Sequence, residues 1–397
     1  MVRSAVLQYF KLPRPVTVSV FAPRGQKTGP DRTFEHYLKW VFRAKKDAAG
    51  NVIRYKAQLV AQEFSQVLGV DYFNTFAPVA RLASICTVLG FAAAEDYETG
   101  QIDKKATYLN GKLTEDKVIF MKQAPGYEEA GEGGKVKVLR LWKTLYGLKQ
   151  AGRRWYQKLV EIMMKLGFLR CEGDQAVFYR RCEKTNVLII VLVHVDDCSI
   201  VGKTKALIAQ FKVKIAKFVD ITDMGNLHWI LGIEVHRIRE ERKLLLSHKS
   251  YIDSILQHYS LEDLKPVSTP MDPSAQLTSA QSLLTMEEIA AMRHVPYHEA
   301  VGSLMYATLG TRPDICFAVQ MVSRFNSKPG LAHWEAIKQI FHYLKGMKEL
   351  WLAYGGVTRD LVGYADVDAD GSMSEDRKAI SGYAFIVHGG AVSWSAK

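Results

Sequence analysis

The sequence has few cysteines, no long apolar run and no internal repeat, and each absence excludes a class of protein. Its five cysteines lie far apart and form no Cys-X-X-Cys pair, so the 397-residue chain has neither a disulfide framework nor a typical zinc site. The longest apolar run, 187–193, is far shorter than the ~20 residues that a membrane-spanning helix needs. The N-terminus contains no secretory apolar segment. We therefore expect an intracellular protein with no membrane partner.

Acidic residues are outnumbered by basic ones. The 53 Lys and Arg residues against 41 Asp and Glu residues give a formal charge of +12. Such an excess is compatible with a polyanionic partner, usually nucleic acid, although composition alone leaves a plain basic surface open as the alternative. Hydrophobic residues (48%) and charged residues (24%) occur at ordinary globular levels. The length predicts roughly two to three domains.

Breaker residues and periodicity divide the chain into segments. Proline and glycine over 1–37 predict an irregular N-terminal extension. Two strand-like stretches within 40–64 predict a hairpin, and the apolar segment 82–94 predicts a buried helix. Apolar residues recur at helical spacing over 155–166. The proline-rich segment 266–273 predicts an extended linker and a domain boundary.

A helical pattern follows this linker. Thr285 and Glu288 have the spacing of a capping box. One helix face downstream is predicted from apolar residues at helical spacing, namely Tyr297, Val301, Leu304 and Met305. After about residue 351 the pattern changes to strands.

Two adjacent carboxylates, Asp196 and Asp197, follow the most apolar stretch of the chain, 187–195. That stretch predicts a central strand that is buried on both faces and enters a tight hairpin. Burial of even one carboxylate is costly without a compensating cation, so the pair favours a divalent metal, and Mg²⁺ prefers oxygen ligands. A solvated turn is the open alternative, because Asp is common in turns.

A third carboxylate is needed if two metal ions are to lie ~4 Å apart and clamp an in-line phosphoryl transfer. The candidate is Asp103, which also ends a strand-like stretch before a turn. Side chains of successive strand residues point to opposite faces, so Asp196 and Asp197 should not ligate equally. We expect Asp196 to be the principal partner of Asp103.

Several segments, taken in order, resemble the copia-type reverse transcriptases of long-terminal-repeat retrotransposons, and the resemblance extends from about Trp40 to Lys397. The matching segments are RYKAQLV at 54–60, VDYFNTFAPVAR at 70–81, QID at 101–103, LNG at 109–111, LYGLKQ at 145–150, HVDD at 194–197, LGIE at 231–234, KPVSTP at 265–270, VGSLMY at 301–306, TRPDI at 311–315 and GYAD at 363–366.

The resemblance implies an α+β, right-hand polymerase that copies an RNA or DNA template from a primer with dNTPs. Fingers and a palm with a ferredoxin-like βαββαβ core would occupy 38–265, a helical thumb or connection 266–350, and an incomplete RNase H-like segment 351–397. The catalytic carboxylates are matched by three residues that would hold two Mg²⁺ ions, or Mn²⁺, namely Asp103, Asp196 and Asp197.

Other positions are assigned by the same resemblance. Tyr108 resembles the steric gate that excludes a 2′-hydroxyl, Gln150 a residue near the sugar and phosphates of the nucleotide, and Lys56 a fingers residue that faces the triphosphate. The primer grip is matched by Leu231, Gly232, Ile233 and Glu234, and the first RNase H carboxylate by Asp366. From the residues alone, a core tyrosine, a surface glutamine, a solvated lysine and a plain glycine turn remain open.

The sequence departs from the family pattern at His194, where a tyrosine is usual, and at Gln58, where an arginine is usual and would add a fixed cation. RNase H activity is not expected, because few acids follow Asp366. A fragment of a longer Pol polyprotein is implied, located in the cytoplasm (in virus-like particles) or the nucleus, with a homodimer or other Pol-derived proteins as further partners. A decayed remnant that binds nucleic acid without catalysis is the alternative function.

Overall fold

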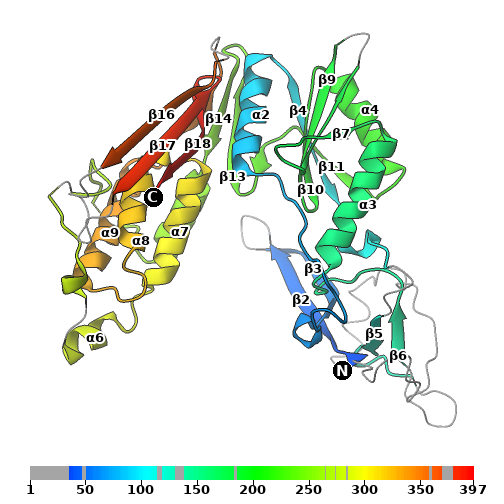
Figure 1. Ribbon diagram of the computed structural model, residues 1–397, viewed down its shortest axis with the longest axis horizontal. Coiled ribbons are helices and arrows are strands. Elements are labelled where there is room, and N and C mark those ends of the chain that lie inside the picture. Colours follow the sequence, from blue (N-terminus) through cyan, green and yellow to red (C-terminus); the bar gives the residue numbers. More distant parts are fainter. Residues whose placement is uncertain are drawn as a thin grey trace.

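The computed structural model describes residues 35–46, 51–113, 119–129, 138–182, 186–263, 265–272, 274–282, 285–356, 360–368 and 379–397. Its centre is an antiparallel six-stranded sheet in the order β11-β4-β10-β9-β8-β7 (Figure 1). These strands are β4 (Glu98–Lys104), β7 (Leu169–Arg170), β8 (Val177–Arg181), β9 (Leu188–His194), β10 (Asp197–Gly202) and β11 (Ile221–Gly225).

Two helices cover one face of this sheet, α3 (Ala151–Lys165) and α4 (Lys205–Ala216). The apolar stripe of α3 lies against that face, as its periodicity predicts, and the helix begins four residues before the predicted segment. Along the chain, β4, α3, β9, β10, α4 and β11 form a βαββαβ unit, with two further strands (119–122 and 138–141) inserted before α3 and the β7–β8 hairpin inserted after it. Strand β9 lies between β8 and β10, so the prediction of a central apolar strand is confirmed.

The opposite face is covered by α2 (Leu82–Ala94), which has the bounds that the sequence predicts. This helix packs between the central sheet and a second sheet of order β12-β13-β14-β15. The second sheet consists of β12 (Trp229–Ile230), β13 (Ile233–Ile238), β14 (Lys243–Ser247) and β15 (Leu352–Tyr354). Since α2 contacts apolar residues of both sheets and Thr87 alone among its residues is exposed, its extensive burial explains its near-continuous apolar sequence.

The N-terminal part forms two smaller β structures. The predicted hairpin is confirmed as the antiparallel pair β2 (Leu38–Lys46) and β3 (Val52–Ala61). A three-stranded sheet contains β1 (Glu35–His36), β5 (Ile119–Lys122) and β6 (Val138–Leu141). The predicted irregular extension is therefore wrong at residues 35–36, because β1 pairs in parallel with the distant β5. Residues 1–34 of that extension lie outside the described residues.

A group of helices lies between β14 and β15 in the sequence. They are α5 (Lys249–His258), α6 (Met286–Met292), α7 (Tyr297–Gly310), α8 (Cys316–Ser323) and α9 (Leu331–Gly346). Those after the proline-rich segment agree with the predicted helical pattern, whereas α5, before that segment, was not predicted. The capping box is confirmed, because Thr285 Oγ1 accepts the Glu288 amide at 3.2 Å and the Glu288 carboxylate accepts the Thr285 amide at 3.0 Å. On α7, Met305 does not belong to the buried face and is 46% exposed, since it lies about 100° around the helix from buried Leu304.

The proline-rich segment has no helix or strand over 265–272, in agreement with an extended conformation. It is nevertheless attached to α9 along its length. Gln339 on α9 donates to the main-chain oxygen of Thr269 at 3.1 Å, and His342 Nδ1 lies 2.5 Å from the main-chain oxygen of Lys265. The segment therefore packs against the helices that follow it.

The C-terminal strands β16 (Val362–Asp368), β17 (Ile380–Val387) and β18 (Gly390–Ala396) form an antiparallel sheet. Strand β18 packs against α2 and α8, and its residue Val392 belongs to the apolar core beneath α2. The indole of Trp394 donates to the main-chain oxygen of Thr308 on α7 at 2.9 Å. Within the described ranges, the helices are too short or too polar to cross a bilayer.

Candidate active site

The two sequence regions that carry carboxylates meet at one end of the central sheet. Strands β4 and β10 are paired so that Asp103 lies directly opposite Asp197. Directly opposed residues of an antiparallel pair project from the same face, with their Cβ atoms about 5 Å apart. Ile102 and Cys198 project from the other face into the core beneath α3 and α4. The sheet thus separates an apolar face from a face with carboxylates.

Asp196 lies in the two-residue turn that joins β9 to β10, next to this pair. Its main-chain oxygen accepts the amide of Lys104 at 3.0 Å, so the turn is bonded to the end of β4. We expected Asp196 to be the principal partner of Asp103, whereas the register gives Asp197 the position directly across. The reason is that the turn consists of Val195 and Asp196, and β10 begins at Asp197.

The three carboxylates act on one another electrostatically. Burial, followed by the charges of Asp196 and then Asp103, raises the pKa of the Asp197 carboxyl above its ordinary value. No group of three or more His, Cys, Asp or Glu side chains is arranged as a complete metal site in the parts of the chain that the structure describes. Carboxylate oxygens are nonetheless the ligands that Mg²⁺ prefers, and substrate phosphates and water commonly complete its shell. The donor set therefore fits a hard divalent cation.

A buried lysine lies behind the carboxylates. Lys104 is 2% exposed, its Nζ lies 2.8 Å from Cys198 Sγ, and it lies 5.6 Å from the ring centre of Trp155. Because Lys104 follows Asp103 on β4, its side chain leaves the opposite face of the strand. Its charge is among the smaller influences on Asp197 and lowers that pKa. The cation therefore offsets part of the negative potential from the core side.

Two tyrosines lie beside the carboxylates. Tyr108 is on the 3₁₀ helix η2 (Thr107–Asn110), and its ring centre is 5.2 Å from that of Tyr146 in an edge-to-face arrangement. Burial raises the pKa of both phenols, and the charge of Asp196 raises each further. The structure thus brings the predicted steric-gate residue close to the carboxylate end. It adds Tyr146, which the sequence analysis did not single out although it lies in the LYGLKQ segment.

The loop that carries Tyr146 is bonded to the end of β3. The amide of Ala61 donates to the main-chain oxygen of Tyr146 at 2.7 Å. The next residue, Gly147, has φ +85°, and a Cβ there would lie 2.1 Å from the main-chain oxygen of Ala61. Only glycine fits this close approach. The β2–β3 hairpin is therefore connected to the site through the main chain.

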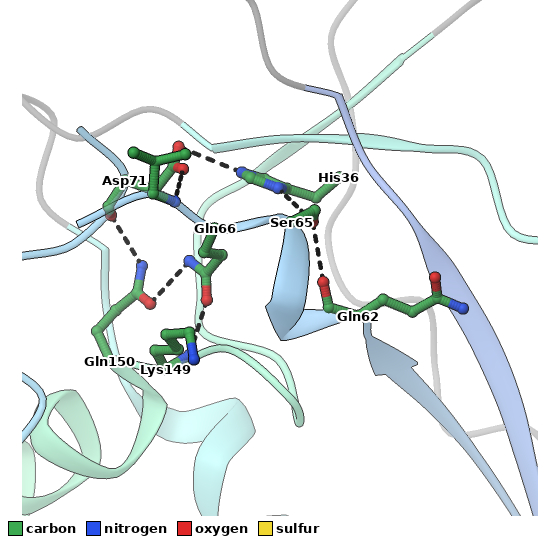
Figure 2. A network of polar contacts seen from close by, with 8 residues as sticks. His36, Gln62, Ser65, Gln66, Asp71, Lys149 and Gln150 are labelled. Atoms are coloured by element: carbon green, nitrogen blue, oxygen red, sulfur yellow. Dashed lines mark hydrogen bonds and ion pairs between the residues drawn. The ribbon is translucent and has the colours of Figure 1, made fainter.

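Gln150 immediately precedes α3 and is buried (Figure 2). Its Oε1 accepts the side-chain amide of Gln66 at 3.0 Å, and its Nε2 donates to the main-chain oxygen of Asp71 at 3.2 Å. Gln66 in turn accepts the amide of Lys149 at 2.8 Å. Both ends of the Gln150 amide are thus used within the protein, which is not the arrangement of a side chain open to a nucleotide.

The same network extends to β1. The His36 ring lies 3.2 Å from an Asp71 carboxylate oxygen through Nε2 and 2.7 Å from Ser65 Oγ through Nδ1. The other Asp71 carboxylate oxygen accepts the amide of Val67 at 2.7 Å. These contacts fix the 66–71 loop against the start of α3 (Figure 2).

The remaining predicted residues lie on separate elements. Lys56 is exposed on β3, directly across from Arg43 of β2, so two cations occupy one face of the hairpin. Leu231 and Gly232 form the turn between β12 and β13, and Glu234 lies on β13 opposite Trp229. Leu231 lines a small hollow together with His194 and Asp197, so the predicted primer grip lies next to the carboxylates.

Asp366 is exposed on β16, opposite Gly382 of β17, and belongs to a different sheet from the three other aspartates. The other candidate acids beyond Asp368, at positions 370, 375 and 376, lie outside the described residues.

Comparison with known proteins agrees with this geometry. The family described as "Reverse transcriptase (RNA-dependent DNA polymerase)" matches residues 28–273. The chain is 44% identical over 359 residues to the retrovirus-related Pol polyprotein from transposon TNT 1-94 of Nicotiana tabacum, which is 90% of this chain and 27% of that protein. It is 35% identical to the Pol polyprotein from transposon RE1 of Arabidopsis thaliana, over 90% of this chain and 24% of that protein.

A transposon Ty5-1 protein of Saccharomyces cerevisiae is 28% identical over 75% of this chain and 92% of its own length. The chain spans about a quarter of the length of the two plant Pol polyproteins. The family match covers well over half of the chain and includes both carboxylate strands and the hairpin between β9 and β10. The chain therefore belongs to the reverse transcriptase family.

Proposed function

We propose that this chain is an RNA-directed DNA polymerase of a copia-type retrotransposon that transfers the nucleotidyl group of a dNTP onto a primer 3′-hydroxyl, with release of pyrophosphate. The observation that carries the proposal is the register that sets Asp103 opposite Asp197, with Asp196 in the adjoining turn. Membership of the reverse transcriptase family supports the same reaction class.

Asp103, Asp196 and Asp197 would hold two Mg²⁺ ions, and Mn²⁺ suits the same oxygen donors. When bound, the ions lower the pKa of the primer hydroxyl and neutralise the charge on the triphosphate and the departing pyrophosphate. The chain supplies the carboxylates at one end of the sheet, where burial, and then the charges of Asp196 and Asp103, raise the pKa of Asp197. Asp196 is kept in place by its main-chain bond to Lys104.

The nucleotide would be selected and held by three residues. Tyr108 would exclude a 2′-hydroxyl, because its ring lies beside the carboxylate end and is supported by Tyr146. Lys56, exposed on the β2–β3 hairpin, would attract the triphosphate. Gln150 would act indirectly, because its amide fixes the 66–71 loop.

The turn and following strand that contain Leu231, Gly232, Ile233 and Glu234 would hold the primer terminus through main-chain groups. Within this proposal, residues 38–265 act as fingers and palm, 266–350 as thumb or connection, and 351–397 as an RNase H-like segment without nuclease activity, in which Asp366 is a remnant. The partners would be an RNA or DNA template with its primer, a second copy of the chain or other Pol-derived proteins. The proposed location is the cytoplasm, in virus-like particles, or the nucleus.

Primer extension on poly(rA)·oligo(dT) by the purified chain tests the proposal. We expect extension with Mg²⁺, none with a chelator and none by Asp196→Asn. Both proteins should bind the primer–template equally at low salt, because the substitution leaves the basic surface unchanged. A parent chain that binds the duplex without extending it would refute the polymerase.

The second candidate is a remnant that binds nucleic acid without catalysis. The observation in its favour is His194, which pairs with Asp197 across the hairpin and whose Nδ1 is buried without a hydrogen-bond partner among the described residues. A buried polar atom without a partner is unfavourable and disturbs the residue next to the carboxylates. This candidate expects binding that is independent of Mg²⁺ and unchanged in Asp196→Asn.

A further inference from the structure

The turn between β12 and β13 has a backbone that needs support from outside. Leu231 has φ +51° and Gly232 has φ +73°, the pattern of a two-residue type I′ turn. Glycine adopts this conformation readily, whereas leucine rarely does. The β12–β13 pairing gives this turn little support, because β12 contains only Trp229 and Ile230. Another part of the chain must therefore help to hold the turn.

That part is α7. The hydroxyl of Tyr306 donates a hydrogen bond to the main-chain oxygen of Leu231, 75 positions earlier in the sequence. A Cβ placed on Gly232 would lie 3.3 Å from the same hydroxyl oxygen, so the phenol lies against both turn residues. Its ring is fixed by neighbours in the helical group: the ring centres of Tyr251 and His248 are 4.8 and 5.3 Å away.

The other side of the turn faces the carboxylates. Leu231 lines the hollow that also contains Gln101, His194 and Asp197. A displacement of Leu231 would therefore change the shape of this hollow beside Asp197. The chain of contacts runs from the helical group through one phenol hydroxyl to a main-chain oxygen and then to the carboxylate end of the sheet.

We propose that Tyr306 is a positioning residue for the primer terminus. Its hydroxyl fixes the Leu231–Gly232 turn, and the main-chain groups of that turn hold the primer end in line with the carboxylates. The inference rests on the proposed polymerase function and adds a residue from α7 to it. The tyrosine does not touch the reacting atoms and acts through the turn.

Tyr306→Phe removes the hydroxyl and keeps the ring. Tyr251→Phe is the matched control, because the Tyr251 hydroxyl donates to the main-chain oxygen of Ser303, at 3.0 Å, within the helical group and away from the turn. A primer with 2-aminopurine at its 3′ end reports on the terminus without any chemistry, and a label far from the end reports on duplex affinity. Single-turnover incorporation and thermal unfolding complete the set.

For Tyr306→Phe we expect a brighter 2-aminopurine signal and an incorporation rate about two- to tenfold lower, as for the loss of one hydrogen bond. Duplex affinity and the KM for dNTP should stay within about twofold of the parent. Tyr251→Phe should lower the thermal midpoint about as much as Tyr306→Phe does. It should leave the 2-aminopurine signal and the incorporation rate at parent level. Equal 2-aminopurine signals and rates in the two variants would overturn the inference.

The two proposals can fail separately. A parent chain that does not extend primers would refute the polymerase, while the 2-aminopurine signal would still test Tyr306. A 2-aminopurine primer end that is equally bright in parent and Tyr306→Phe, in a parent that does extend primers, would refute the role of Tyr306 alone.

Discussion

The indole of Trp155 on α3 donates a hydrogen bond to the main-chain oxygen of Val195, with 3.1 Å between the two atoms. Val195 has φ +56° and directly precedes Asp196 in the turn between β9 and β10. This conformation costs a β-branched residue about 1–2 kcal/mol. The hydrogen bond from the buried indole thus helps to hold a strained residue in the turn that contains Asp196.

Trp155→Phe removes that donor. We expect the free energy of unfolding in urea to fall by about 1–3 kcal/mol, from the lost bond and the smaller ring, and incorporation to slow because Asp196 loses support. Trp142→Phe is the control, because Trp142 is 39% exposed and its replacement should cost under about 0.5 kcal/mol. If Trp155→Phe is destabilised but incorporates nucleotides at the parent rate, the hydrogen bond to Val195 does not contribute to catalysis.

Asp197 makes the stability of the metal-free protein depend on pH. Burial, and then the charges of Asp196 and Asp103, raise its pKa above 3.8 in the folded state. The folded protein then binds this proton more tightly than the unfolded chain does, so the free energy of unfolding falls as the pH rises from 3.8 through the higher folded value. Asp197→Asn should therefore raise the thermal midpoint at neutral pH and have little effect well below pH 3.8.

Asp366→Asn is the matched control for this measurement, because Asp366 is exposed on another sheet and should leave the midpoint unchanged at both pH values. Mg²⁺ should stabilise the parent through binding to the folded state and stabilise Asp197→Asn less. An equal response of parent and variant to Mg²⁺ would contradict the assignment of Asp197 as a ligand.

Tyr108→Ala tests the steric gate. The smaller side chain should admit a 2′-hydroxyl, so the preference for dNTP over rNTP, measured as the ratio of kcat/KM values, should fall by about tenfold or more. Tyr146→Ala serves as the comparison, because the two rings are in contact. If Tyr146→Ala alone lowers the preference, Tyr146 is the gate and the assignment of Tyr108 is wrong.

Gln66 and Gln150 should act as one unit. Gln66→Ala and Gln150→Ala each break the 3.0 Å bond between the two side chains, so the double variant should lose less stability than the sum of the single losses, by about 1 kcal/mol. If Gln150 acts on the nucleotide indirectly, both single variants should raise the KM for dNTP to a similar degree. A much larger effect of Gln150→Ala alone would indicate direct contact with the nucleotide.

Gly147→Ala should be severely destabilising. A methyl group there meets the main-chain oxygen of Ala61 at 2.1 Å in addition to the strain of a positive φ. Gly69→Ala isolates the strain, because Gly69 has φ +83° and nothing within 4 Å of an added Cβ. We expect a loss of about 1 kcal/mol at Gly69 and more than about 3 kcal/mol at Gly147, measured by urea unfolding. Equal losses of stability in the two variants would show that β3 can move away from an added methyl group at position 147 at little cost.

Local sequence patterns predicted the elements that present the carboxylates. The near-continuous apolar run of α2 and the β-branched run of β9 each define one element, because extensive burial leaves few polar residues to interrupt the run. The strand and turn around Asp103 were predicted from a strand-like stretch followed by a turn, without an apolar run. The family motifs then predicted which polar residues at the ends of these elements carry chemistry.

Relations between distant segments could not be predicted in the same way. The pairing of Asp103 with Asp197 depends on a register that both strands and their packed helices set together. Gln150 is occupied by Gln66, which is 84 positions away, and Tyr146 meets Tyr108 through the fold of an intervening sheet. A local pattern contains no information about such partners, so Tyr146 was overlooked, and the family resemblance put Gln150 near the sugar and phosphates of the nucleotide without its contact to Gln66.

The C-terminal strands are part of the core that supports the carboxylates. Val387 and Val392 pack beneath α2, whereas Asp366 is exposed at the far side of the same three-stranded sheet. Replacement of Asp366 should therefore change the stability of the fold little. Deletion of the last strand, β18, would expose the apolar surface of α2. The acidic residue on β16 and the last strand of the same sheet are thus under different constraints: the first can be replaced without loss of the core, and the second cannot.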